Sequence, residues 1–164
     1  MLDFDRERKD LTKALSQTEI KVDLAFDFAN TDRLFNFLTQ GKGRVLHYSG
    51  HGHPEYLAIE DDWGKMYRLN VKDLEEWIKI GGGSLEFVFV SACHSRKAGE
   101  AFVAAGVKHV VCCQRDDQLI RNDAAAIEFE KAFYQDLVNC KTISQAFEMG
   151  RQKVKTSHHT WTET

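Results

Sequence analysis

Two segments of this chain share one design, and they constrain its fold more than any other feature. Each is a short apolar run of the kind found in buried strands, followed by small residues and one reactive side chain. Residues 46–52 carry His51 in this way, in a glycine-flanked loop after the strand, and residues 88–93 end on Cys93. We therefore expect two buried strands, each delivering a reactive group just past its end, as a nucleophile and its base would be.

The remainder of the chain alternates between strand and helix patterns. Helices are expected at residues 5–16, 31–40, 71–80, 99–105, 122–139 and 142–154, and strands at 20–28, from 45 toward His51, and at 56–59, 66–69, 85–90 and 107–112. This alternation predicts a three-layer α/β/α sandwich around a mostly parallel central sheet. The sequence begins on a helix, which leaves room for a further strand of this sheet upstream. Ligands of such sheets bind beyond the carboxyl ends of the strands.

Length and composition indicate one ordinary globular domain. The chain has 164 residues, 43% hydrophobic and 29% charged, with a formal net charge of −3. We expect a single domain over residues 1–155 and an unstructured tail over 156–164, where no packing signal is present. The weak acidic charge predicts no nucleic-acid partner. No apolar run is long enough for a membrane span and no signal peptide is present, so a cytoplasmic protein without membrane contact is expected.

The four cysteines form no C-x-x-C pair, which argues against zinc and redox motifs. Reduced thiols in a reducing compartment are the simplest interpretation. For Cys112, Cys113 and Cys140 we expect buried thiols that pack as small apolar residues. Cys93 fits this interpretation less well, although a cysteine at a strand end is more often structural than catalytic.

Catalysis by Cys93 needs a proton acceptor and donors for an oxyanion. A free thiol has a pKa of about 8.5, so His51 is expected to take its proton and later give it to the leaving amine. The backbone N–H groups of Gly52 and Cys93 are the expected oxyanion donors. Gly52 has no side chain, so a substrate carbonyl can approach its backbone closely.

The other candidate sites are weaker. The H-x-x-x-H-x-H spacing of His47, His51 and His53 suits a metal site on a helix, but this segment has a strand pattern. We therefore expect no metal, with His47 packed inside the strand and His53 at the rim of the site. The acidic residues 60–62 predict a polar hairpin tip more than a calcium site. Glycines 81–83 precede a strand and lack the residues of a phosphate loop, so no cofactor is expected and a flavodoxin-like binding domain is disfavoured.

Several short motifs occur in a fixed order along most of the chain. They are Leu46-His47-Tyr48-Ser49-Gly50-His51-Gly52, Val90-Ser91-Ala92-Cys93-His94-Ser95, Gly99-Glu100-Ala101-Phe102-Val103-Ala104-Ala105-Gly106-Val107, Ala132-Phe133-Tyr134 and Ala146-Phe147. The first is similar to the H-Y-S-G-H-G motif of metacaspases. The ordered set most closely resembles CHAT domains, which are modules with the caspase-like cysteine peptidase fold, related to metacaspases and caspases.

The resemblance implies roles for individual residues. His51 resembles the general base of the family, Cys93 its nucleophile and Gly52 its oxyanion donor. Ser49 matches a position that lines the specificity pocket of metacaspases. Ser91 departs from the pattern, because metacaspases have there an aspartate that receives a basic substrate residue.

The missing acid leaves the substrate preference open. Asp116 or Asp117 can replace it, and either would favour cleavage after Arg or Lys. An inward-pointing Arg115 would favour an acidic residue instead, and a solvated charged loop with no role in the pocket is an equal alternative.

A function follows from the resemblance. It implies a cysteine endopeptidase that cleaves protein or peptide substrates through an acyl-enzyme, regulated by flanking domains or partner proteins. The alternative is a CHAT-like module that has lost peptidase activity and acts in protein interactions. The intact pair of His51 and Cys93 favours the peptidase, while a site that stays closed until a partner binds remains compatible with either.

Overall fold

The structure is a computed structural model and describes residues 4–16, 21–41, 43–81, 83–113 and 123–158. Its residues fall into two compact units. A terminal unit combines residues 1–26 with residues 117–164, and a central unit comprises residues 27–116. His51 and Cys93 both belong to the central unit. The single domain predicted for residues 1–155 stays a prediction.

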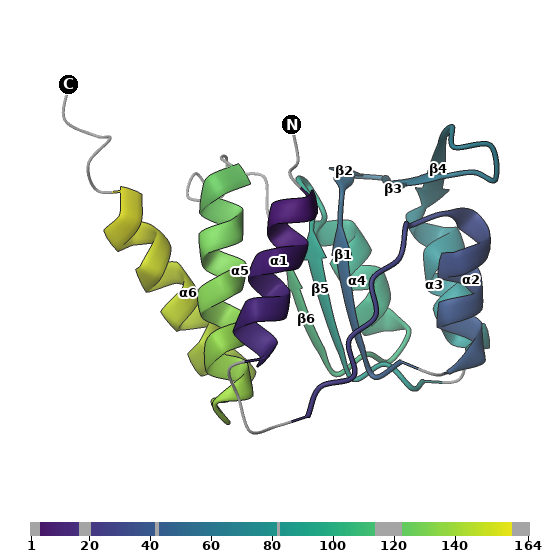
Figure 1. Cartoon of the computed structure of the whole chain (residues 1–164). Helices are drawn as coiled ribbons and strands as arrows, with labels where there is room; N and C mark the ends of the chain where they lie inside the picture. Colours follow the sequence, from purple (N-terminus) through teal and green to yellow (C-terminus); the bar gives the residue numbers. More distant parts are fainter. Residues whose placement is uncertain (1–3, 17–20, 42, 82, 114–122, 159–164) are drawn as a thin grey trace. The chain divides into compact units, whose positions relative to one another are not determined.

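A parallel sheet forms the middle of the central unit (Figure 1). Strand β5 (Phe87–Ser91) lies between β1 (Val45–Ser49) and β6 (His109–Cys112), and both neighbours run parallel to it. The first four residues of β5 are all buried. A continuous apolar run is what a central strand covered on both faces requires. The predicted α/β class with a parallel sheet is confirmed.

Three helices belong to this unit: α2 (Thr31–Gln40) precedes β1, α3 (Val71–Ile80) precedes β5, and α4 (Arg96–Ala104) connects β5 to β6. Helix α2 begins where expected, because the Asn30 side chain accepts a hydrogen bond from the Arg33 N–H at 2.8 Å. It ends at Gly41, whose φ of 63° is readily adopted by glycine. Buried apolar residues of these helices, of β5 and of the hairpin described next form one continuous core.

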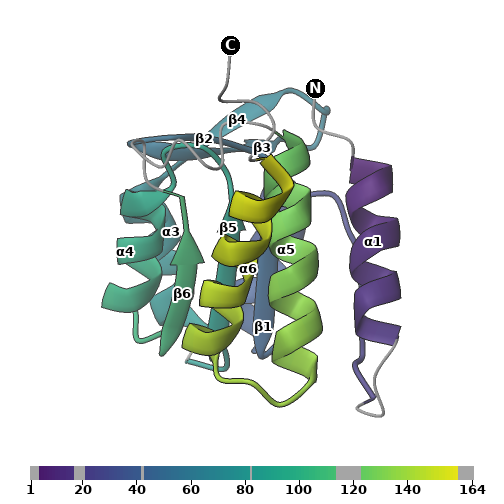
Figure 2. The ribbon, with the colours of Figure 1, turned by 90° about the vertical axis from the view of Figure 1, so that its left-hand side faces the viewer.

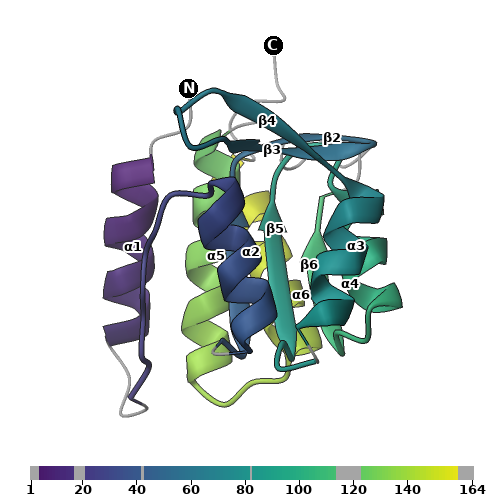
Figure 3. The ribbon, with the colours of Figure 1, turned by 90° about the vertical axis from the view of Figure 1, so that its right-hand side faces the viewer.

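A second, antiparallel sheet follows β1 and consists of β2 (His51–His53), β3 (Tyr56–Glu60) and β4 (Met66–Asn70) (Figure 3). The predicted hairpin of β3 and β4 is confirmed, and its inner face buries Leu57 and Leu69. The prediction that His51 lies in a loop is wrong. His51 begins β2, because β3 offers its free edge as a pairing partner three to seven residues further along the chain.

The strand predicted at residues 20–28 is wrong. None of the described residues 21–29 belongs to a strand. None of the described apolar side chains of this segment is buried: Val22, Leu24 and Phe26 are 39–40% exposed, and Phe28 is 77% exposed. An alternation of apolar and polar residues indicates which face of a sheet each side chain would occupy. A strand also needs backbone hydrogen bonds to the edge of a neighbouring strand.

The terminal unit contains the helices α1 (Phe4–Ser16), α5 (Asp123–Val138) and α6 (Ile143–His158), with α5 and α6 side by side (Figure 2). Helix α6 starts with a capping box, in which Thr142 and Gln145 each accept a hydrogen bond from the other's backbone N–H. The helix continues to His158, so the boundary predicted at residue 155 falls inside it. No helix among the described residues has both the length and the apolar character of a membrane span.

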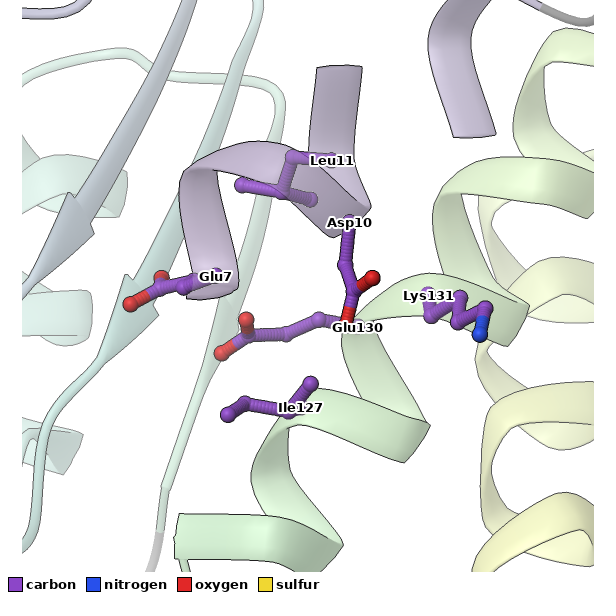
Figure 4. Close-up of a pocket in the computed structure, with 6 residues that line it drawn as sticks. All are labelled: Glu7, Asp10, Leu11, Ile127, Glu130 and Lys131. Atoms are coloured by element: carbon purple, nitrogen blue, oxygen red, sulfur yellow. The ribbon is translucent and has the colours of Figure 1, made fainter. Parts of the chain in front are cut away.

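The contact between α1 and α5 includes two buried acids, Glu7 and Glu130 (Figure 4). Their carboxylate oxygens lie within 4.8 Å of each other. Burial, followed by the charges of Glu130 and Glu7, raises the pKa of the neighbouring Tyr134 well above its ordinary value. The amphipathic pattern of α1 did not predict an acid on its buried face.

Candidate active site

His51 and Cys93 each lie two positions past the end of one of two adjacent parallel strands. Strand β1 ends at Ser49 and β5 ends at Ser91, and these two serines are register partners. The pairing of the two segments continues one residue beyond β1, because the Gly50 N–H donates a hydrogen bond to the Ser91 carbonyl at 3.1 Å. The sheet therefore brings His51 and Cys93 to the same level at its carboxyl edge, where α/β sheets bind their ligands.

Gly52 is in direct backbone contact with the turn that carries Cys93. A Cβ atom built on Gly52 would lie 2.2 Å from the Cys93 carbonyl oxygen and 3.0 Å from the Ala92 Cβ. No side chain fits in this space. Glycine at position 52 therefore lets the chain after His51 lie directly on the backbone of Cys93.

Tyr48 ties the hairpin to the parallel sheet, a role that the sequence did not predict. Its side chain is buried, and its hydroxyl lies 2.7 Å from the Ala58 carbonyl and 3.2 Å from the His51 carbonyl, to which it can donate. A Cβ atom on Gly50 would lie 2.6 Å from the same hydroxyl oxygen. Tyr48 thus holds β2 and β3 in place over the end of β1.

The turn of Cys93 connects β5 to α4 and is held by a residue that sequence reasoning missed. Ser95 is fully buried; its hydroxyl donates to the Val90 carbonyl at 3.3 Å and accepts from the Cys113 N–H at 3.0 Å. It thereby joins the ends of β5 and β6. The preceding His94 has a φ of 56°, in the left-handed region that few non-glycine residues adopt. The only feature of the sequence that could have indicated this role is a small residue with a hydroxyl group two positions after Cys93.

The His51 imidazole and the Cys93 thiol are both exposed. Across the described ranges, no hydrogen bond joins the two groups. His51 pairs with Ala58, while Gly52 pairs with the buried Leu57, so the imidazole starts from the outward face of the hairpin sheet. Catalytic hydrogen bonds are often long without substrate and shorten when substrate binds.

The other histidines of this region have structural contacts. His47 lies in the middle of β1 and stacks on Phe89, with ring centroids 4.9 Å apart. His53 is exposed, accepts a hydrogen bond from the Glu55 N–H at 3.2 Å, and stacks on Tyr56 at 4.4 Å. These contacts agree with packing for His47 and a rim position for His53.

Ser49 and Ser91, predicted to line the specificity pocket, are paired and partly buried beneath the two reactive residues. The structure therefore places the backbones of five of the seven predicted site residues at one edge of the sheet. Asp116 and Asp117, together with Arg115, lie outside the described residues.

The remaining cysteines differ from one another. Burial, and secondly the charge of Glu100, raises the pKa of the Cys112 thiol. Cys112 is packed tightly, because a Cβ atom on Gly99 would lie 2.6 Å from its sulfur. The prediction that Cys140 is buried is wrong: it is exposed on the turn between α5 and α6, where its φ is 61°.

Replacing Tyr48 by phenylalanine is expected to lower the free energy of unfolding by about 1 kcal/mol, the net worth of one hydrogen bond. Burial raises the Tyr48 pKa above its ordinary value of 10.0. The folded state therefore binds the phenolic proton more tightly, so this stability is present below about pH 10 and is lost as the pH rises further. Urea unfolding at several pH values should show a steeper alkaline loss for the wild type than for Tyr48→Phe. Equal pH slopes would contradict this role of Tyr48.

A parallel α/β sheet with a histidine and a cysteine at its carboxyl edge is the arrangement that the caspase-like class predicts. The family model described as CHAT domain matches residues 3–162, and the chain belongs to this family. The predicted caspase-like fold is thereby confirmed. A protein named Roc-COR-CHAT protease, from an unknown prokaryotic organism, is 26% identical to the chain over 166 residues. The match covers 94% of this chain and 15% of that protein's length.

Proposed function

We propose that this chain is a cysteine endopeptidase with Cys93 as nucleophile and His51 as general base. One observation carries the proposal. The two residues extend two positions past register-paired ends of adjacent parallel strands, and Gly52 lies against the backbone of Cys93. Membership of the CHAT family and the relative's name, which includes the word protease, support the same class.

In the proposed mechanism, His51 accepts the thiol proton and the Cys93 sulfur attacks the carbonyl carbon of the substrate. Negative charge develops on the carbonyl oxygen, and the backbone N–H groups of Gly52 and Cys93 donate to it. The peptide C–N bond then breaks as His51 returns the proton to the leaving amine. Water, deprotonated by His51, hydrolyses the thioester and restores the thiol.

The pocket next to the nucleophile is assigned by the same proposal. Ser49 and Ser91 form its floor, because they are register partners two positions before the two reactive residues. Asp116 or Asp117 supplies the charge that Ser91 lacks, which favours cleavage after Arg or Lys. Replacing both aspartates by asparagine is then expected to remove this preference.

Regulation by further domains is part of the proposal. The chain corresponds to 15% of a relative whose name joins Roc and COR to CHAT. We infer that domains of this kind, or separate partner proteins, control access to the site. A cytoplasmic location stays a prediction.

Incubation of the full chain with a diverse peptide library, read by mass spectrometry, tests the proposed function. Wild type is expected to generate new termini at a common residue, whereas Cys93→Ala and His51→Ala generate none. Intact mass should also show a covalent acyl adduct on Cys93 during turnover. Peptide binding without hydrolysis would favour the silent interaction module, in keeping with the absence of a hydrogen bond between the two exposed side chains. Hydrolysis that survives both substitutions would refute the dyad.

The thiols provide an internal control for activation of Cys93. Cys93 and Cys140 are both exposed, whereas Cys112 is packed and has a raised pKa. At neutral pH we expect iodoacetamide to alkylate Cys93 fastest, Cys140 at the rate of an ordinary thiol and Cys112 slowest, because the thiolate is the reacting form. His51→Ala should slow Cys93 about tenfold and leave Cys140 unchanged. Equal rates for Cys93 and Cys140 in the wild type would argue against activation.

A further inference from the structure

The outward face of the hairpin sheet carries an arginine in line with His51. His51 pairs with Ala58 across β2 and β3, and Ala58 pairs with Arg68 across β3 and β4. Register partners in an antiparallel sheet share a face, so the three side chains form one row. The opposite face is marked by the buried pair Leu57 and Leu69. The three strands of this row lie side by side in Figure 3.

Arg68 is exposed and is oriented by an aromatic ring. Its guanidinium carbon lies 5.3 Å from the centroid of the Tyr56 ring, which itself stacks on His53. A guanidinium held over an aromatic face is attracted to the ring and keeps its charge. His53 and Tyr56 thus lie beside the row, and the Tyr56 ring supports the Arg68 guanidinium.

No carboxylate of the described residues forms an ion pair with Arg68. Glu60 lies on the same outward face, where it is the register partner of Met66, but it is not within ion-pair distance of Arg68. Ala58, between Arg68 and His51, has only a methyl group. The row therefore has the charged Arg68 at one end and the proposed general base His51 at the other. Between them, the short side chain of Ala58 leaves the surface open.

We propose that Arg68 is a specificity-determining residue that binds an acidic side chain, Asp or Glu, of the peptide substrate. This inference rests on the proposed function. A guanidinium can bind a carboxylate through two parallel hydrogen bonds, which gives geometric selectivity as well as charge. The low surface at Ala58 lets the peptide pass from the reacting bond at His51 to Arg68.

The spacing limits where the acidic residue lies. Neighbouring strands are about 4.8 Å apart, so the backbones at His51 and Arg68 are separated by about 10 Å. An extended peptide advances about 3.3 Å per residue. The acidic residue is therefore expected about three residues from the scissile bond.

The test uses the full chain and a set of cleavable peptides in which one of the four positions on either side of the scissile bond at a time is Glu, Gln or Lys. Wild type should cleave the Glu peptide with a kcat/KM about tenfold higher than the Gln peptide at one position. Arg68→Ala should remove this ratio, so that Glu and Gln peptides are cleaved with similar kcat/KM. Arg68→Glu should reverse it, so that Lys is preferred over Glu at that position. Lys72→Ala, which removes an exposed cation from α3, is the matched control and should keep the wild-type ratio.

The outcomes separate this inference from the proposed function. Cleavage by wild type with a Glu-to-Gln ratio near one at every position, or an unchanged ratio in Arg68→Ala, would overturn the role of Arg68 and leave the peptidase intact. Absence of any Cys93-dependent cleavage would refute the peptidase and the subsite together. Binding of the same peptides to Cys93→Ala, followed by fluorescence anisotropy, measures the Arg68 preference without turnover and should show the same ratio.

Discussion

Replacing Cys93 by alanine is expected to lower kcat for peptide hydrolysis by at least about 10,000-fold, the scale seen when a covalent nucleophile is removed. The Cys93 sulfur is the only protein atom that forms a covalent bond to the substrate carbonyl carbon in the proposed mechanism, so its loss removes the acyl-enzyme route. Its side chain is exposed, so the substitution removes no core packing. Hydrolysis of the best library peptide, measured over hours, covers the required range.

Cys140→Ala is the matched control for this experiment. Cys140 is also an exposed thiol and also lies in a turn, but it belongs to the terminal unit. Its substitution should leave kcat within about twofold of wild type, and both variants should have wild-type melting temperatures. A Cys93→Ala variant that retains a tenth of the wild-type rate would contradict nucleophilic catalysis by this residue.

Replacing Gly52 by alanine has the second largest expected effect, a loss of about 100-fold in kcat/KM. The new Cβ would lie 2.2 Å from the Cys93 carbonyl oxygen, so the β2 backbone and the Cys93 turn must separate. A misplacement of about 1 Å between reacting groups is enough for a loss of this size. Overpacking of this contact should also lower the free energy of unfolding by about 1–3 kcal/mol.

Gly64→Ala is the control for a loss of stability that does not involve the contact with Cys93. Gly64 lies in the β3–β4 turn with a φ of 70°, and a Cβ atom there meets nothing within 4 Å. Its substitution should cost about 1–2 kcal/mol of stability from the left-handed conformation alone, with unchanged kcat/KM. If Gly52→Ala kept wild-type kcat/KM, the close contact between positions 52 and 93 would have no catalytic importance.

The parallel sheet could be predicted because its signals are local. The apolar run at residues 85–90 predicted a central strand, and β5 is buried along almost its whole length. The charged turn between two alternating segments likewise predicted the hairpin of β3 and β4. In both cases periodicity and turn residues lie within a few positions of the element that they specify.

The errors came from properties that depend on distant partners. Residues 20–28 alternate like a strand, yet the described part of this segment pairs with no strand. Cys140 is small and apolar enough for a core, but the turn that contains it faces solvent. Composition and periodicity indicate what a residue can tolerate, whereas its surroundings depend on how the elements pack.

The sequence alone determined which residues are candidates for the chemistry: His51 and Cys93, each placed after a strand, with Gly52 beside the histidine. Only the tertiary structure decided that these positions meet, because register-paired strands and the contact of Gly52 with the Cys93 carbonyl join residues some 40 positions apart. It also revealed Tyr48 and Ser95, whose hydrogen bonds reach 10 and 18 positions along the chain. Hydrogen bonds between residues this far apart produce no periodic pattern in the sequence, since the packing of the elements decides which residue each side chain bonds to.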